Sequence, residues 1–119
     1  MAGKVNFKIN QGETFKHTLR WLDSAETAID LTGYKARMHV RARVDSVDVL
    51  LFLSSDPLDL PDGTITFIGN GTISLKITDE VTSAITWNAG VYDLEMEDSL
   101  GDVTRLIEGK VTVTKEVTR

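Results

Sequence analysis

The segment from Tyr34 to Val44 alternates apolar residues with mostly charged ones, and this pattern constrains the fold more than any other. A period of two places alternate side chains on opposite faces of an extended strand, whereas a helix has a period of 3.6. Valine, isoleucine and threonine, which branch at Cβ and favour extended backbone, make up 33 of the 119 residues. The sequence therefore predicts an all-β chain whose strands each bury one face.

Further β-rich runs predict more strands, and turn residues separate them. Gly69-Asn70-Gly71 predicts a hairpin turn, Gly109 predicts a bend or bulge in the last strand, and Asp79–Ile85 is the one candidate helix. About eight strands with turns every ~8–12 residues are typical of an antiparallel sandwich or barrel. Nothing divides residues 1–119 into more than one domain. Besides Tyr34–Val44, the expected strands are Lys4–Ile9, Glu13–Leu22, Val47–Leu53, Thr64–Ile68, Thr72–Ile77, Val91–Glu97 and Val103–Val117.

Two of these strands carry opposite charges on their polar faces. The Tyr34–Val44 strand presents a basic row, and the Val91–Glu97 strand presents an acidic row. Opposite charges directly across an antiparallel pair contribute roughly 0.2–1 kcal/mol each. We therefore expect the two strands to be neighbours, with Arg37, His39 and Arg41 facing Asp93, Glu95 and Glu97.

Charge and composition exclude several classes of protein. A net charge of −5 and a pI near 4.9 disfavour nucleic-acid binding, which needs a basic surface. The absence of cysteine excludes zinc–thiolate sites and thiol catalysis. The sequence lacks the roughly 20-residue apolar run of a membrane helix, and its N-terminus lacks the apolar run of a secretory signal. We therefore expect no nucleic-acid partner and no membrane partner.

The sequence shows no catalytic constellation, so we do not expect an enzyme. Its two histidines, His17 and His39, lie in no nucleophile motif, and His17 falls on an apolar face. The aspartates between Asp56 and Asp62 lack the glycine and distal glutamate of an EF-hand. We assign no catalytic, cofactor-binding or metal-binding residue. The alternative that stays open is a small carbohydrate-binding or other ligand-binding module, which would use Trp87 and the Asp56–Asp62 loop.

The order of several motifs resembles a family of small tailed-phage virion proteins, in particular the N-terminal domain of the upper baseplate proteins of phages that infect Gram-positive bacteria. The resemblance covers nearly the whole chain. It rests on Gln11–Phe15, Ile29–Arg41, Gly71–Leu75, Thr78–Thr82, Gly90–Asp98 and Arg105–Val113. It implies a single antiparallel immunoglobulin-like β-sandwich in which Tyr92 hydrogen-bonds to backbone.

The resemblance also implies a role in a virion. In the baseplate proteins this domain precedes helical and receptor-binding portions, which do not follow here before Arg119. We therefore expect a tail or baseplate adaptor or decoration protein, assembled in the bacterial host cytoplasm, that forms homo-oligomers and contacts other virion proteins without a cofactor. Exposed strand edges are natural docking places. The candidate interface residues lie in the two terminal strands: Val5, Phe7, Ile9, Val113 and Val117.

Overall fold

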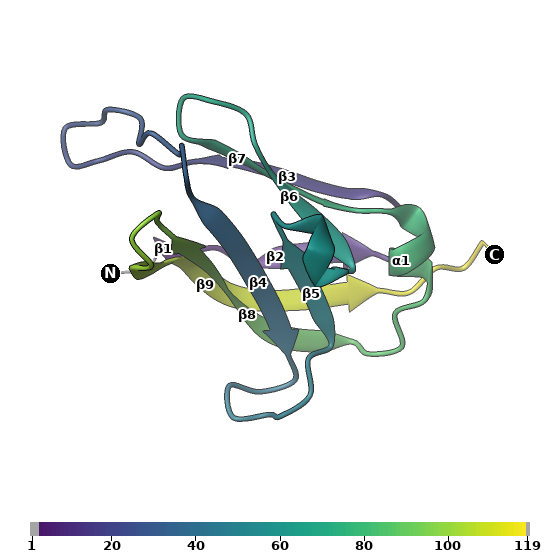
Figure 1. Ribbon diagram of the computed structural model, residues 1–119. Helices are drawn as coiled ribbons and strands as arrows, with labels where there is room; N and C mark the ends of the chain where they lie inside the picture. The colour runs from purple at the N-terminus through teal and green to yellow at the C-terminus, as the bar shows by residue number, and fades with distance from the viewer. Residues whose placement is uncertain (1–2, 119) are drawn as a thin grey trace.

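The computed structural model describes residues 3–118, and within them the chain forms nine strands, one short α-helix and one 3-10 turn, η1 (Figure 1). The all-β class expected from the sequence is confirmed. The elements are β1 (Gly3–Lys4), β2 (Phe7–Asn10), β3 (Phe15–Arg20), β4 (Lys35–Arg41), β5 (Leu51–Ser54), η1 (Pro57–Asp59), β6 (Gly63–Phe67), β7 (Thr72–Ile77), α1 (Asp79–Ser83), β8 (Ala89–Glu97) and β9 (Val103–Thr114).

The strands form one continuous sheet that curls around the core. Their order is β1-β9-β8-β4-β5-β6-β7-β3, and β2 pairs with β9 next to β1. In Figure 1, the layer that holds β3, β6 and β7 lies across from the layer that holds β4, β8 and β9. The β2 side and the β3 side of the sheet approach each other. The ring of Phe7 on β2 meets the ring of Phe15 on β3 edge-on, with 5.6 Å between the centroids.

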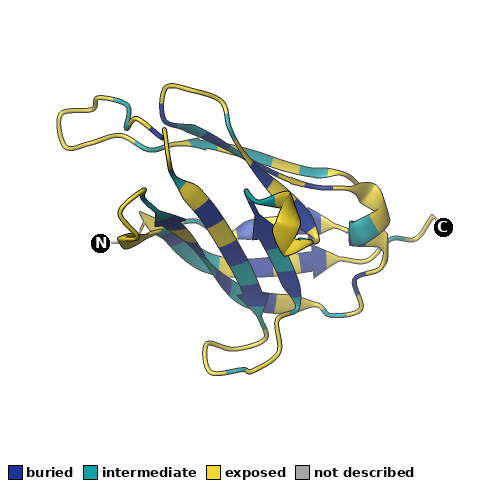
Figure 2. Ribbon diagram, viewed as in Figure 1, coloured by how far each residue is buried: buried dark blue, intermediate teal, exposed yellow. Residues whose placement is uncertain are grey.

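The core fills the inside of this curl with the apolar residues that the alternation places inward. Leu53 of β5, Ile73 and Leu75 of β7, and Leu94 of β8 are completely buried. Along β4, buried and more exposed residues alternate as predicted, and the stripes are visible on the ribbon in Figure 2. The period-two pattern therefore identified the buried face of the sheet.

The expectation of an antiparallel sheet is correct only in part. Five of the eight pairings are antiparallel, but β1 and β2 run parallel to β9, and β5 runs parallel to β6. The first and last strands lie side by side in the same direction. The loop that contains η1 carries the chain back, so that Leu53 and Gly63 begin the same parallel ladder. The predicted single strand Lys4–Ile9 is divided between β1 and β2.

The bulge expected at Gly109 lies elsewhere in the last strand. Leu94 faces Ile107 and Glu95 faces Arg105, so Leu106 is the extra residue of the bulge. Gly109 serves a different purpose, because a Cβ at this position would lie 2.1 Å from the carbonyl oxygen of Val5. This glycine allows the N-terminal segment to lie against β9.

The two oppositely charged strands are neighbours, as predicted. In the antiparallel β4–β8 pair, Arg37 faces Glu95 and His39 faces Asp93. The pairs differ from the expected ones at both ends of the row, since Glu97 faces Lys35 and Arg41 faces Val91 rather than a carboxylate. The ion pair runs diagonally, with 3.6 Å between the Arg37 guanidinium and the Glu97 carboxylate. The basic row of β4 is therefore largely matched within its own sheet.

Tyr92 hydrogen-bonds to backbone as the resemblance implies, and its partner lies in the N-terminal segment. The phenol donates to the carbonyl oxygen of Val5 at 2.5 Å, and its ring stacks on Phe7 at 4.8 Å. Burial raises the pKa of Tyr92 far above its usual value, with Glu108 adding to the shift. The neutral phenol thus fixes the N-terminal segment to β8.

We expect Tyr92→Phe to lower the free energy of unfolding by about 1 kcal/mol, because the Val5 carbonyl loses a partly buried donor. Urea denaturation monitored by tryptophan fluorescence measures this loss. Tyr34→Phe is the matched control, since the Tyr34 hydroxyl makes no hydrogen bond within residues 3–118. Equal stabilities of the two variants would contradict the role given to Tyr92.

Candidate protein-binding cleft

A cleft of about 360 Å³ lies between β2 and β3. These strands follow each other in the chain but are not paired, because β2 pairs with β9 and β3 pairs with β7. The cleft therefore marks the place where the curled sheet fails to close. Its lining comes from Asn6–Lys8, Asn10 and Glu13–His17.

Within residues 3–118, β3 has a partner strand on one edge only, and the backbone groups of its other edge are unpaired. Trp21 N–H donates to the Gly71 carbonyl oxygen at 2.8 Å, which sets the odd-numbered residues of β3 toward β7. The N–H and C=O groups of Lys16 and Thr18 consequently point the other way. By the same logic, Val5 and Gln11 bond to β9, so the backbone of Lys8 faces the cleft from β2. Two open strand edges thus face each other.

The inward side chains of β3 are less buried than those of its neighbour. Phe15, His17 and Leu19 are only half-buried, whereas Ile73 and Leu75 on β7 are completely buried. The difference has a geometric cause, since β3 has a neighbour on one side only. The rings of Phe7 and His17 meet edge-on at 4.8 Å and form part of the apolar floor.

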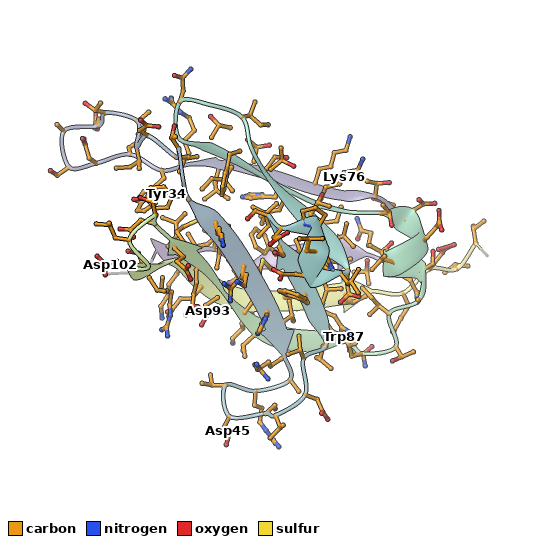
Figure 3. The ribbon with its side chains drawn as sticks, in the orientation of Figure 1. Tyr34, Asp45, Lys76, Trp87, Asp93 and Asp102 are labelled. Carbon is orange, nitrogen blue, oxygen red and sulfur yellow. The ribbon has the colours of Figure 1, made fainter. Side chains whose placement is uncertain are left out.

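The outer face around the cleft is basic. Lys16 of β3 lies directly across from Lys76 of β7, and both side chains are exposed (Figure 3 labels Lys76). Like charges directly across an antiparallel pair are destabilising. Lys8 lines the opposite wall, and the carboxylate in the lining, Glu13, accepts a hydrogen bond from Asn10 at 3.3 Å. Within residues 3–118, none of these three lysines forms an ion pair.

The turn between β2 and β3 closes one end of the cleft and is held by α1. Thr82 is completely buried, and its hydroxyl accepts from Gly12 N–H at 3.1 Å and donates to the Glu13 carbonyl at 2.8 Å. The Gln11 side chain also donates to the Ile85 carbonyl at 3.1 Å. These hydrogen bonds attach the turn to α1 and the residues after it, in a position where β2 and β3 do not pair as a hairpin.

The expected interface residues are placed differently from one another. The side chains of Phe7, Ile9 and Val113 are buried in the core, and Val5 is half-buried. Only Val117 is exposed, at 92%. The accessible parts of β2 are therefore its backbone edge and its outward side chains rather than its apolar residues. The alternation alone predicted this inward face, but not that β2 and β3 would stay apart.

The other candidate residues take part in the fold. Trp87 is half-buried against the core and, together with Val81, Ile85 and Asp62, lines a hollow of about 350 Å³. Asp56 and Asp62 accept hydrogen bonds from backbone N–H groups at 2.9 Å. Within residues 3–118, no three histidine, aspartate or glutamate side chains gather into a metal-binding group, and no helix has the length and apolarity to cross a membrane.

The imidazole of His39 lies in the charged surface of β4 and β8. Its ring meets Phe52 edge-on at 4.9 Å, and Nδ1 is 3.3 Å from the Arg41 guanidinium. Partial burial lowers the pKa of His39, the Arg41 charge adds to this effect, and Asp93 and Glu95 oppose it. The folded chain therefore binds a proton at His39 less readily than the unfolded chain does.

We expect the free energy of unfolding to fall as pH drops below about 6.5, the usual histidine pKa in an unfolded chain, because His39 is then protonated preferentially in the unfolded state. In His39→Gln this part of the pH dependence disappears. Urea denaturation at several pH values between 7.5 and 5.5 tests it, with His17→Gln as control. Parallel pH profiles for wild type and His39→Gln would refute the assignment.

Comparison with known proteins adds little to this geometry. No protein-family model and no curated protein matches the chain. Among solved structures, the titin M3 domain is similar with 13% sequence identity and a TM-score of 0.48, over 94% of this chain and 88% of that domain. Fold and cleft define an all-β protein with two open strand edges.

Proposed function

We propose that the chain is a structural component of a tailed-phage virion, a tail or baseplate adaptor or decoration protein that acts through protein–protein contacts. In this proposal the curled sheet is an immunoglobulin-like β-sandwich. Several copies would assemble with other virion proteins in the host cytoplasm.

The observation that carries the proposal is the pair of open edges on β2 and β3. Unpaired N–H and C=O groups on an exposed strand are a template for pairing with another chain, and proteins usually cover or disrupt such edges. Here the edges of Lys8 and Lys16 face a cleft with an apolar floor, and Thr18 continues the open edge of β3. A docking role explains why this edge is left open.

The segments that resemble the baseplate proteins add support, because they include the three longest strands of the sheet. Ile29–Arg41 contains β4, Gly90–Asp98 contains most of β8, and Arg105–Val113 forms most of β9. These three strands are consecutive in the sheet, in the order β9-β8-β4. Three of the six resembling segments thus lie side by side in the sheet.

The test is mass spectrometry of tailed particles purified from the host that encodes the chain. We expect the chain to co-purify with particles at a constant ratio to the tail proteins through a density gradient. Light scattering of the purified chain across a concentration series then measures its own association. Absence of the chain from purified particles would reject the virion role.

A further inference from the structure

We infer that the cleft between β2 and β3 receives an extended acidic segment of a partner protein, which adds to β3 as a new strand. This inference rests on the proposed protein–protein role and names the chemistry of the partner. The incoming segment alternates acidic residues on its outer face with apolar residues on its inner face.

Backbone geometry favours β3 as the receiving strand. Its six residues, Phe15–Arg20, exceed the four of β2, Phe7–Asn10. Lys16 and Thr18 each direct an N–H and a C=O away from β7 along the open edge of β3, whereas on β2 the Asn10 carbonyl already accepts from Glu13 N–H at 3.1 Å. A strand laid along β3 would therefore find a regular set of donors and acceptors, as in other cases of strand addition.

The inner side of the added strand must be apolar because of what it would cover. Phe15, His17 and Leu19 are half-buried, and the edge-on contacts that Phe7 of β2 makes with the rings of Phe15 and His17 leave these side chains partly exposed. An apolar residue at alternate positions of the incoming strand would cover them as β7 covers their other side. Each such residue removes apolar surface from water.

The outer side must be acidic because of the three lysines. A residue next to Lys16 on the outer face would lie between β3 and the β2 wall that carries Lys8, with Lys76 one strand further away. A carboxylate at this position would relieve the repulsion between the directly opposed Lys16 and Lys76. The nearby Glu13 is at the closed end, where Asn10 binds it. An acidic segment is therefore preferred over a neutral or basic one.

The experiment titrates the purified chain with a nine-residue peptide that alternates glutamate with valine, and follows backbone amide signals by NMR. We expect the amides of Lys16 and Thr18 to shift and that of His17, which points to β7, to change little. A lysine–valine peptide of the same length is expected to bind at least tenfold more weakly. A peptide with its glutamates and valines in two separate blocks tests the need for alternation.

A charge reversal tests the lysine contribution. Lys16→Glu is expected to weaken the acidic peptide about tenfold, since an attractive cross-strand pair becomes a repulsive one. Arg43→Glu, an equal change of charge at an exposed loop position outside the cleft, is expected to leave the affinity unchanged. The peptide comparison does not depend on how any variant folds.

Three outcomes would overturn the inference. The first is equal binding of the acidic and basic peptides. The second is binding that shifts signals elsewhere and leaves the Lys16 and Thr18 amides unchanged. The third is a dimer of the chain alone in which these amides are already protected, because a second copy would then occupy the cleft. Failure of the peptide leaves the virion test intact, and absence from virions leaves the peptide result intact.

Discussion

Gly109→Ala is expected to lower the free energy of unfolding by about 3 kcal/mol or more, the largest effect of any single methyl group that we predict. The new Cβ would lie 2.1 Å from the Val5 carbonyl oxygen, 2.8 Å from the Val5 carbonyl carbon and 2.9 Å from Asn6 Oδ1. Two of these atoms are backbone, so no change of rotamer relieves the clash. The N-terminal segment must move away from β9.

That movement breaks several hydrogen bonds together. Val5 N–H donates to the Glu108 carbonyl at 3.0 Å, and Lys110 N–H donates to Asn6 Oδ1 at 3.0 Å. Tyr92 also loses its acceptor on Val5. We therefore expect faster hydrogen exchange at Val5 and Lys110 in the variant, together with a lower midpoint of thermal unfolding.

Gly3→Ala is the matched control for this prediction. Gly3 also lies against β9, but a Cβ there would be 3.6 Å from the nearest atom, a methyl group of Ile107. This is an ordinary van der Waals distance, and the substitution should change stability by less than about 0.5 kcal/mol. If both alanine variants unfold at the same temperature, the close approach of Val5 to Gly109 does not require a glycine at this position.

Alternation in the sequence predicted local faces well and strand partners less well. It placed Met38 and Val40 inside and Arg37 outside, because neighbouring side chains of a strand necessarily point to opposite faces. Charge predicted one strand pairing, because the basic row of β4 and the acidic row of β8 attract each other when the two strands are neighbours. The prediction of the buried faces uses only residues within one strand, and the prediction of the pairing uses only the charges of two strands.

Direction and closeness of distant segments could not be predicted in this way. The apolar positions Phe7 and Ile9 identify the buried face of β2 whether its partner runs parallel or antiparallel. A glycine inside a strand is compatible with a bulge or with a close neighbour. The atoms that decide for Gly109 belong to Val5 and Asn6, more than 100 residues away. The parallel pairing and the purpose of Gly109 are therefore tertiary properties.

The cleft likewise depends on tertiary contacts, although the turn beside it can be recognised in the sequence. Gln11-Gly12 marks the end of a strand, and Gly12 adopts a φ of 89°, which favours glycine. A tight turn between two β-rich runs is also typical of a hairpin, which would pair β2 with β3 and leave no cleft. The residue that holds the turn elsewhere, Thr82, is about 70 residues further along the chain.

We expect Thr82→Val to lower the free energy of unfolding by about 2 kcal/mol, because it leaves the partners of a completely buried hydroxyl without a hydrogen bond. Valine nearly preserves the shape of threonine, so the loss reports on the hydroxyl rather than on a cavity. Gly12 N–H loses its acceptor and the Glu13 carbonyl loses its donor. Urea denaturation measures the difference, and Thr82→Ser, which keeps the hydroxyl, should retain most of the stability.

The same variant separates stability from the geometry of the cleft. Without urea, and at a temperature where Thr82→Val is still folded, the Gly12 and Glu13 amides should exchange hydrogen faster than in the wild type. Lys16 and Thr18 should remain in the β3–β7 pair. Binding of the glutamate–valine peptide should then weaken, because the turn no longer holds the closed end of the cleft in one position. Unchanged exchange at Gly12 would show that water replaces the hydroxyl, and the separation of β2 from β3 would then depend on their pairing with β9 and β7 alone.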